Sequence, residues 1–503
     1  MIELEQDSPN QPTWQTIVHL LVGLLIVYVA ARPVIHALHR HFFLESDSVA
    51  YIGLGTNLWH GRGFTDFAGN WCSDWPPLYP FFIGLSELLA RNEVLAVGIV
   101  GGLCFAATIL FAYIWLGRLT RSLFVRVVVT VMLALSVPLT NLANSGLSEI
   151  LFVPLSVASM YFTAAYLDRG LRRNLLLSAF IALLCCLARY IGIAMIAAAL
   201  IAILISPKQT IKRRLSDSGI FLIISVVPFA GWCAINHWIN GDWMGQRIPG
   251  DHTFRECWIA LITCLQNTLV QDCFSIILAF ASLAGLVSLV ITRKKDYLPY
   301  LSVALYFVVF YASLLVWSSA TYSIDMVDDR LTYPLFVPLI LISVGLIECL
   351  RTAIWRPAAI ALTAAFGLLF GWIILDSTAT AQIPDGGYLS SDWSESGVLS
   401  YVKDNEFKEK LYTNDSSAIY LFSDKGAECI ADQTDSPTMP YVESVFDSLP
   451  NQSYIVWLYN GLEPNNFSAN AIRSKCNLRI VAKFDDGVIF QRKGSGQETA
   501  SSM

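Results

Sequence analysis

Charged residues are scarce in this chain. Asp, Glu, Lys and Arg make up 14% of its 503 residues, whereas 55% of the residues are hydrophobic. A soluble globule of this length needs a larger polar surface than such a composition supplies. The composition therefore excludes an ordinary soluble protein and predicts a polytopic α-helical membrane protein.

The sequence also lacks the common signals of soluble chemistry. No glycine-rich phosphate loop follows a predicted strand, and no repeat of fixed period is present. The 11 cysteines have no zinc-binding spacing, and most of them lie in or beside apolar runs. Cys429 and Cys476 both follow the last apolar run, so a disulfide between them stays open. These absences argue against soluble nucleotide chemistry and against a zinc site.

Long apolar runs predict about 11 membrane spans. A long run at 174–205 contains Arg189 and is divided there into two short spans. The first span lacks a preceding positive charge and a small-residue cleavage site, so it is expected to remain as an anchor. The other runs lie at 16–35, 94–117, 123–139, 147–167, 217–238, 272–292, 297–318, 331–350 and 356–375.

Lysine and arginine predict the orientation of the spans. With the N-terminus in the cytoplasm, about 15 basic residues fall in cytoplasmic loops and about seven in the opposite loops. The expected topology therefore has the N-terminus inside and the C-terminus outside. The long first loop, at about 36–93, and the C-terminal region are expected to be extracytoplasmic.

The composition becomes polar after about residue 376, which divides the chain into two expected domains. Residues 1–375 form the transmembrane domain, 376–493 a small extracytoplasmic α/β domain, and 494–503 a disordered tail. Within the second domain, Asp485-Asp486-Gly487 predicts the turn of a hairpin. The other expected elements are a helix at 393–404, a strand at 410–413, a helix at 440–449, a strand at 454–459 and the hairpin strands 478–484 and 488–492.

The first loop carries acidic residues beside the membrane, which is costly without a polar task. Apolar positions predict that 48–59 is a helix lying along the interface. Asp47 and Tyr51 are four residues apart and would share one face of that helix. The alternative is structural, because Ser46 or Asp47 could simply cap its N-terminus.

The ordered set of motifs resembles the GT-C membrane glycosyltransferases, and is most similar to their bacterial protein-mannosyltransferase-like and aminoarabinose-transferase-like members. The resemblance covers about residues 16–375 and extends to the small outward domain. It rests on Glu45-Ser46-Asp47, Tyr51, Trp75-Pro76-Pro77-Leu78-Tyr79-Pro80, Arg189-Tyr190, and Arg330 with Pro334 and Pro338.

The resemblance implies that the first-loop acidic motif supplies the catalytic carboxylate, which it assigns to Asp47. A positioned carboxylate can orient an acceptor hydroxyl or amine and remove its proton. Glu45 is the second candidate. Asp74 would orient acceptor or sugar, or would only begin the turn at the double proline. Tyr51, Trp75 and Tyr79 are the other expected substrate contacts of this loop.

The leaving group implied by the resemblance is a lipid phosphate, which needs fixed positive charge. Arg189 interrupts an apolar run at the outer ends of two spans, where a topology-setting arginine would not normally lie. Arg330 follows Asp328-Asp329 and opens the next span. We expect both arginines to bind donor phosphate. The alternatives are a structural ion pair for Arg189 and pairing with the preceding aspartates for Arg330.

Two further residues are candidate substrate contacts. Glu149, at the outer end of a span, either pairs with Arg189 or contacts the sugar. The alternative for this position is structural, because Ser148 could simply cap the span. His237 borders an outward loop expected at 239–272, where interfacial packing is the alternative. Scattered carboxylates could hold a divalent cation, but the sequence does not establish a metal or any other cofactor.

The predicted function is transfer of a sugar, with inversion, from a polyprenyl-phosphate carrier to a lipid, glycan or protein acceptor. The expected location of this transfer is the outer side of a bacterial-type inner (plasma) membrane. No nucleic acid partner is expected. One alternative is a polysaccharide ligase or polymerase that uses a lipid-diphosphate donor. Another is a lipid or solute transporter, which would show related halves and ionisable residues near the midplane of the membrane. The sugar, the acceptor and the oligomeric state are beyond the sequence.

Overall fold

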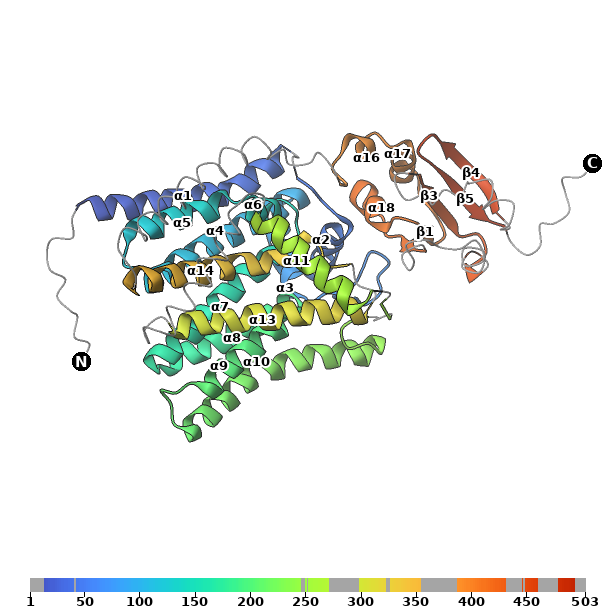
Figure 1. Cartoon of the computed structure of the whole chain (residues 1–503). Helices are drawn as coiled ribbons and strands as arrows, with labels where there is room; N and C mark the ends of the chain where they lie inside the picture. Colours follow the sequence, from blue (N-terminus) through green and yellow to red (C-terminus); the bar gives the residue numbers. More distant parts are fainter. Residues whose placement is uncertain are drawn as a thin grey trace, which may run out of the picture. The chain divides into compact units, whose positions relative to one another are not determined.

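A computed structural model of the chain is drawn in Figure 1. It describes residues 13–39, 42–245, 249–250, 252–270, 298–322, 326–353, 387–430, 446, 448–459 and 478–493. The chain forms two compact units that alternate along the sequence. The first unit is Met1–Phe42, Ser73–Phe82 and Leu89–Ile383, and the second is Phe43–Cys72, Ile83–Leu88 and Pro384–Met503.

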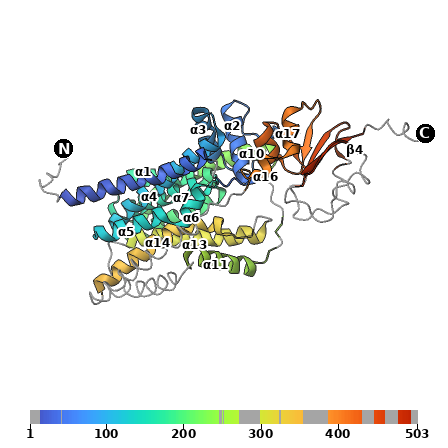
Figure 2. The ribbon, with the colours of Figure 1, turned by 90° about the horizontal axis from the view of Figure 1, so that it is seen from above.

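The first unit is a bundle of helices that run roughly along one direction (Figures 1 and 2). Its helices are α1 (Thr13–Leu38), α4 (Glu93–Leu119), α5 (Leu123–Leu135), α6 (Val137–Ala143), α7 (Glu149–Arg169), α8 (Arg172–Ala188), α9 (Ile193–Ile205), α10 (Ile211–Asn240), α11 (Phe254–Val270), α13 (Leu298–Thr321) and α14 (Asp329–Ala353). Helix α3 (Leu78–Ala90) contributes to both units.

Six of the described helices are long and apolar enough to cross a bilayer: α1, α4, α7, α10, α13 and α14. The pair α5 and α6, bent by 48°, would make a seventh. The chain is therefore a multi-pass membrane protein. The spans predicted at 272–292 and 356–375 lie outside the described residues. The segment 239–272 was predicted as a loop, which is wrong, because α11 occupies much of it.

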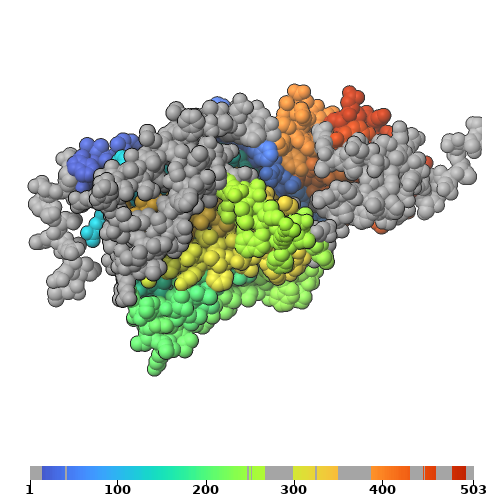
Figure 3. Space-filling model, viewed as in Figure 1, coloured from blue at the N-terminus to red at the C-terminus, as the bar shows by residue number. Residues whose placement is uncertain are grey.

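Apolar side chains cover the outside of the bundle, as lipid contact requires. Helix α1 exposes a row of them: Trp14, Ile17, Leu20, Leu21, Leu24, Val27 and Tyr28. Helices α11 and α13, yellow-green and yellow in Figure 3, reach the surface and expose apolar residues that include Trp258 and Trp317. These surfaces are unsuited to water and suited to hydrocarbon.

Glycines allow α4 to approach its neighbours closely. A Cβ atom at Gly102 would overlap the carbonyl oxygen of Ala30 in α1, and one at Gly101 would overlap the carbonyl oxygen of Ala143 in α6. Helices in lipid associate through such close packing because lipid tails provide no hydrophobic driving force between them. The two adjacent glycines therefore hold α1 and α6 against α4.

We expect Gly102→Ala to lower the thermal unfolding temperature of the detergent-solubilised protein, because overpacking costs about 1–3 kcal/mol. The matched control is Gly231→Ala on α10, where a Cβ atom would meet nothing within 4 Å. That change should be neutral or slightly stabilising. Equal losses in the two variants, measured by tryptophan fluorescence on heating, would contradict the packing argument.

Helix α7 lies at the centre of the bundle, and most of its residues are buried. Its Phe152 packs against Phe307 and Tyr311 of α13, at ring centroid distances of 6.3 and 5.9 Å. The Tyr311 hydroxyl in turn donates a hydrogen bond of 2.9 Å to the carbonyl of Leu331 in α14. These contacts place the N-terminus of α7 beside the first turn of α14.

The predicted break in the run 174–205 is confirmed at Arg189. Helix α8 ends at Ala188, Arg189 is extended (φ −152°, ψ 137°), and a 3₁₀ helix, Tyr190–Gly192, leads into α9. A Cβ atom at Gly192 would lie 2.5 Å from the Cys185 backbone, so the chain doubles back tightly there. Arg189 is consequently presented at a helix end rather than within a helix.

The second unit contains a five-stranded sheet in the order β2-β1-β3-β5-β4. Strand β1 pairs in parallel with β2 and β3, whereas β5 pairs antiparallel with β3 and β4. Its elements are α2 (Ser46–Trp59), α16 (Ser391–Ser394), α17 (Gly397–Asp404), β1 (Leu411–Thr413), α18 (Ser416–Ser423), β2 (Glu428–Cys429), β3 (Tyr454–Leu458), β4 (Leu478–Phe484) and β5 (Gly487–Arg492).

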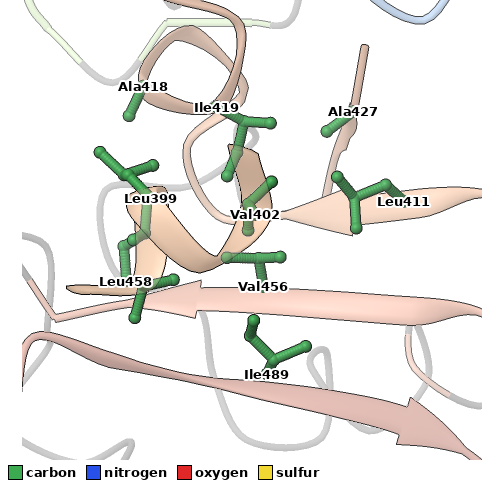
Figure 4. Close-up of a cluster of buried hydrophobic side chains, with 10 residues drawn as sticks. Leu399, Val402, Leu411, Ala418, Ile419, Ala427, Val456, Leu458 and Ile489 are labelled. Carbon is green, nitrogen blue, oxygen red and sulfur yellow. The ribbon is translucent and has the colours of Figure 1, made fainter. Parts of the chain in front are cut away.

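Helices α17 and α18 cover the sheet through a cluster of small and branched apolar side chains (Figure 4). Val402 and Ile419 of the helices pack with Val456 and Ile489 of β3 and β5, and all four are fully buried. The core is compact because β-branched residues on central strands face short helices. It gives the C-terminal residues a hydrophobic core of their own.

The predicted hairpin is confirmed, since β4 and β5 pair around Asp485-Asp486. The helix predicted at 393–404 is divided into α16 and α17. Three other predictions lie wholly or largely outside the described residues: the helix at 440–449, the tail after 493, and the disulfide, which would need Cys476.

Candidate active site

A buried carboxylate begins α7. The side chain of Glu149 is only 1% exposed, although it carries a charge in a predominantly apolar bundle. Ser148 Oγ lies 3.5 Å from Glu149 Oε2. Ser148 occupies the N-cap position of α7, but its side chain makes no cap hydrogen bond and accepts one from Arg189 instead, so the capping alternative holds for its position only. A buried carboxylate at this position requires a positively charged partner.

Arg189 is the first such partner. Its Nη1 atom lies 2.5 Å from Glu149 Oε1 and donates a hydrogen bond of 2.9 Å to Ser148 Oγ. The pairing of Glu149 with Arg189 that the sequence left open is therefore present. The arginine reaches the carboxylate because the α8 helix stops immediately before it.

Arg330 is the second partner. Its Nε atom lies 4.0 Å from the same Glu149 Oε1 and 3.5 Å from Asp328 Oδ2, so the predicted pairing with Asp328 is also present. Asp328 Oδ1 accepts a hydrogen bond of 2.8 Å from the backbone amide of Leu331 at the start of α14. The arginine is therefore held at a helix end by one buried and one half-exposed carboxylate.

Two guanidinium groups from distant parts of the chain thus meet one buried carboxylate, and they keep side-chain exposures of 19% and 18%. Each guanidinium has five N–H donors in a planar fork, so one group can contact several oxygen atoms at once. The shared carboxylate therefore holds two partly exposed arginines beside each other. We call Glu149, Arg189 and Arg330 the arginine–glutamate cluster.

Tyr190, the residue after Arg189, connects the first loop to α10. Its hydroxyl donates a hydrogen bond of 2.7 Å to the carbonyl of Ser73. The same oxygen accepts hydrogen bonds from Trp232 Nε1 at 3.3 Å and from Asn236 Nδ2 at 3.2 Å. Asn240 Nδ2 also donates to Ser73 Oγ at 3.3 Å. Tyr190, which α10 holds through Trp232 and Asn236, therefore fixes the backbone directly before Asp74.

The segment after Ser73 contains three of the predicted substrate contacts. Asp74 is exposed and Trp75 is half-buried, whereas Tyr79, in the first turn of α3, is fully buried. A Cβ atom at Gly245, where φ is +80°, would lie 2.9 Å from the Asp74 Cα atom. This glycine allows the loop after α10 to lie directly against Asp74.

His237 is exposed near the end of α10. Its ring stacks on Trp243 with a centroid distance of 4.4 Å, and Nδ1 lies 2.6 Å from the Gly241 carbonyl oxygen. These contacts match the packing alternative for this histidine. Its role as a substrate contact remains a prediction.

Glu45, Asp47 and Tyr51 belong to the second unit. Glu45 is the N-cap of α2 and forms a capping box with Ser48, whose Oγ accepts a hydrogen bond of 3.2 Å from the Glu45 amide. The prediction that Ser46 or Asp47 caps the helix is therefore wrong. Asp47 lies half-buried in the first helical turn, and Tyr51 is buried one turn later.

Among the described residues, no group of three or more His, Cys, Asp or Glu side chains is arranged to hold a metal ion. The predicted site residues fall into two sets. The structure brings Glu149, Arg189 and Arg330 together in the first unit. It places Glu45, Asp47 and Tyr51 at the N-terminal end of α2 in the second.

Sequence reasoning missed the polar residues that surround Tyr190. Asn236 is fully buried within α10, and Ser73, directly before Asp74, is 4% exposed. A polar amide within an apolar span was the available signal, because such groups are rare in membranes unless they have a partner. Its partner could not be identified from spacing, since Ser73 and Asn236 are far apart in the sequence.

Residues 74–232 match the sequence model of a family described as dolichyl-phosphate-mannose-protein mannosyltransferase. A search of curated proteins finds no match. The resemblance to the GT-C glycosyltransferases drawn from the motifs is therefore supported by a family match over part of the chain.

The fold is similar to that of solved membrane proteins. The apo structure of ArnT from Cupriavidus metallidurans matches with a TM-score of 0.61 and 12% identity, over 93% of this chain and 97% of that one. The structure of the same protein bound to undecaprenyl phosphate matches with a TM-score of 0.58 and 12% identity, over 94% of this chain and 98% of that one. The third match is the oligosaccharyltransferase AglB from Archaeoglobus fulgidus, in complex with an inhibitory peptide and a dolichol-phosphate. Its TM-score is 0.56 at 12% identity, over 86% of this chain and 69% of that one.

Proposed function

We propose that this chain, which shares the fold of ArnT and AglB and a partial match to the mannosyltransferase family, is a membrane glycosyltransferase. It would transfer a sugar from a polyprenyl-phosphate carrier to an acceptor on the extracytoplasmic face, with inversion at the anomeric carbon. The observation that carries this proposal is the arginine–glutamate cluster, because a lipid-phosphate leaving group needs fixed positive charge.

Arg189 and Arg330 are proposed to bind the donor phosphate. The solved relatives of this fold include one bound to undecaprenyl phosphate and one bound to dolichol-phosphate. Two guanidinium groups can donate several charge-assisted hydrogen bonds to a phosphate that gains charge as the sugar leaves. In this role Glu149 positions the two arginines and does not contact the sugar.

Asp47 is proposed as the general base. The acceptor oxygen or nitrogen attacks the anomeric carbon and loses its proton to the Asp47 carboxylate. The bond from the anomeric carbon to the phosphate oxygen breaks, and its electron pair remains on the lipid phosphate. Glu45 is the weaker candidate for this role, because its position at the N-cap explains it structurally.

Asp74, Trp75, Tyr79 and Tyr51 are proposed to frame the substrates, since aromatic rings suit sugar faces. We assign the first loop and the C-terminal residues to the extracytoplasmic side of an inner membrane, with the N-terminus in the cytoplasm. This orientation follows the excess of Lys and Arg in the opposite loops.

Membranes that contain the protein are expected to transfer radiolabelled sugar from at least one member of a panel of polyprenyl-phosphate sugars. Membranes without it are the control, and excess unlabelled polyprenyl phosphate should inhibit the transfer. The panel also includes lipid-diphosphate sugars. Transfer only from the diphosphates would favour a ligase or polymerase, and no transfer from any donor would overturn the enzyme proposal.

A further inference from the structure

The segment that carries Asp47 is held by residues more than 300 positions later in the chain. Leu44 forms a parallel bridge with Gly387, and the Tyr388 amide donates a hydrogen bond of 3.0 Å to the Leu44 carbonyl. Gly387 has φ +66°, and a Cβ atom there would overlap the Leu44 carbonyl oxygen. The backbone entering the acidic motif is therefore paired with the C-terminal part of the second unit.

Tyr388 also connects this bridge to α18. Its hydroxyl lies 2.9 Å from both carboxylate oxygens of Asp415, and Asp415 caps α18 by accepting a hydrogen bond of 2.9 Å from the Ala418 amide. Burial raises the pKa of Tyr388, and the negative charge of the nearby Asp415 carboxylate raises it further. The hydroxyl therefore stays protonated and keeps donating its hydrogen bond to Asp415. The position of α18 is thereby linked to the residue that holds Leu44.

A second contact holds the helix that follows the motif. The Phe67 ring stacks on Tyr420 of α18, with ring centroids 4.5 Å apart and planes at 25°. On its other side, a Cβ atom at Gly53 of α2 would lie 2.8 Å from Phe67 Cδ1. The ring is therefore clamped between α2 and α18. Ser417 Oγ also lies 3.5 Å from the carbonyl oxygen of Ser46.

The loop after α18 closes on the same phenylalanine. A Cβ atom at Gly426 would overlap the carbonyl oxygen of Phe67, so only glycine permits this approach. Contacts before, beside and after the acidic motif thus all come from residues 387–426. A reacting group must be held within about 0.5 Å of its productive geometry, and this requires several supporting contacts of this kind.

We propose that residues 387–426 position Asp47 for catalysis, with Tyr388, Tyr420 and Gly426 as positioning residues. This proposal rests on the proposed function of Asp47. It assigns the C-terminal part of the second unit a role in the reaction step itself. Weakening the contacts that residues 387–426 make with Leu44 and Phe67 would let α2 fluctuate. The Asp47 carboxylate would then be correctly aligned for a smaller fraction of the time.

The test combines hydrogen–deuterium exchange with transfer kinetics on the full-length protein. In Gly426→Ala, exchange of α2 amides should rise about tenfold or more. The kcat should fall by about 10- to 100-fold, because small misplacements of a catalytic group have effects of that size. The KM for the donor should stay within about twofold, because the residues proposed to bind phosphate are unchanged.

Gly397→Ala is the matched control, since its new methyl group would meet the Phe484 ring and no residue of the first loop. Exchange in β3 and β5 reports whether the sheet remains folded. If Gly426→Ala unfolds the sheet, Tyr420→Ala decides instead, because it removes the ring that stacks on Phe67 and should loosen α2.

The exchange measurement does not depend on sugar transfer. Unchanged α2 exchange in Tyr420→Ala would overturn the proposal, whatever the activity. A fall in kcat with unchanged α2 exchange would likewise overturn it. Faster α2 exchange in a protein whose wild type transfers no sugar would instead reject the proposed function while leaving the clamp on α2 established.

Discussion

Replacing Asp47 with asparagine is expected to lower sugar transfer by about 10²- to 10⁴-fold, the usual contribution of a general base. Asparagine has nearly the size of aspartate but cannot accept a proton at neutral pH. The residue lies in the first turn of α2 and is not the N-cap, so the helix should remain folded. The measurement is initial-rate transfer from the active member of the donor panel, at matched expression.

Asp66→Asn is the matched control for this experiment. It makes the same change of charge in the same loop, and the remaining Oδ1 can still accept the hydrogen bonds from Ala68 and Asn70 that form the turn. This variant should transfer sugar at close to the wild-type rate. Equal transfer by Asp47→Asn and wild type would remove Asp47 as the base.

The second large effect is expected at Arg189. Arg189→Gln removes a proposed phosphate ligand and also takes the closest cation from a carboxylate that is 1% exposed. Breaking a buried ion pair on one side costs about 3–5 kcal/mol. We therefore expect a lower thermal unfolding temperature together with a loss of transfer of about 100-fold or more, the size found when one preorganised electrostatic contact is removed.

A double variant separates the structural role from the functional one. Arg189→Gln/Glu149→Gln removes the buried negative charge as well, so the unfolding temperature should recover substantially. Transfer should not recover, because the phosphate ligand is still missing. Recovery of both properties would identify the arginine as a purely structural partner of Glu149.

Arg172→Gln is the control at the opposite end of α8. Arg172 Nε lies 3.7 Å from Oδ1 of Asp217, another fully buried carboxylate. In the variant, Asp217 would still have an ion-pair partner, because Arg213 Nε lies 3.3 Å from its Oδ2 atom. The side chain of Arg172 is 64% exposed, so its removal should change stability and transfer little. A large loss of transfer here would show that the effect of Arg189→Gln is not specific to the proposed phosphate site.

Several parts of the fold could be predicted from local sequence alone. The break at Arg189, the helix after Asp47, the strand at 411–413 and the hairpin around Asp485-Asp486 all depend on neighbouring residues. Apolar run length indicates a membrane span, and an Asp-Gly pair between β-rich runs indicates a turn, without reference to distant residues. The cap of α2 was misassigned by one or two residues, as helix ends often are.

The site was predicted only in part. A charged residue in or at the end of an apolar run marks Arg189 and Glu149 as unusual, because an unpaired charge there would be costly. That both Arg189 and Arg330 meet the single carboxylate of Glu149 follows from the packing of α7 against α13 and of α13 against α14. The choice between structural and functional pairing therefore requires the variants described above.

The sequence by itself determined that this is a multi-pass membrane protein with an acidic first loop and arginines at the ends of its helices. The reason is that the free energy of moving a segment from water into lipid depends on the residues of that segment alone. Only the tertiary structure decided which residues share a site. The clamp of Phe67 between Gly53 and Tyr420, and the approach of Gly426 to the Phe67 backbone, join residues more than 350 positions apart. Such contacts depend on shape complementarity across the whole chain, which no local pattern encodes.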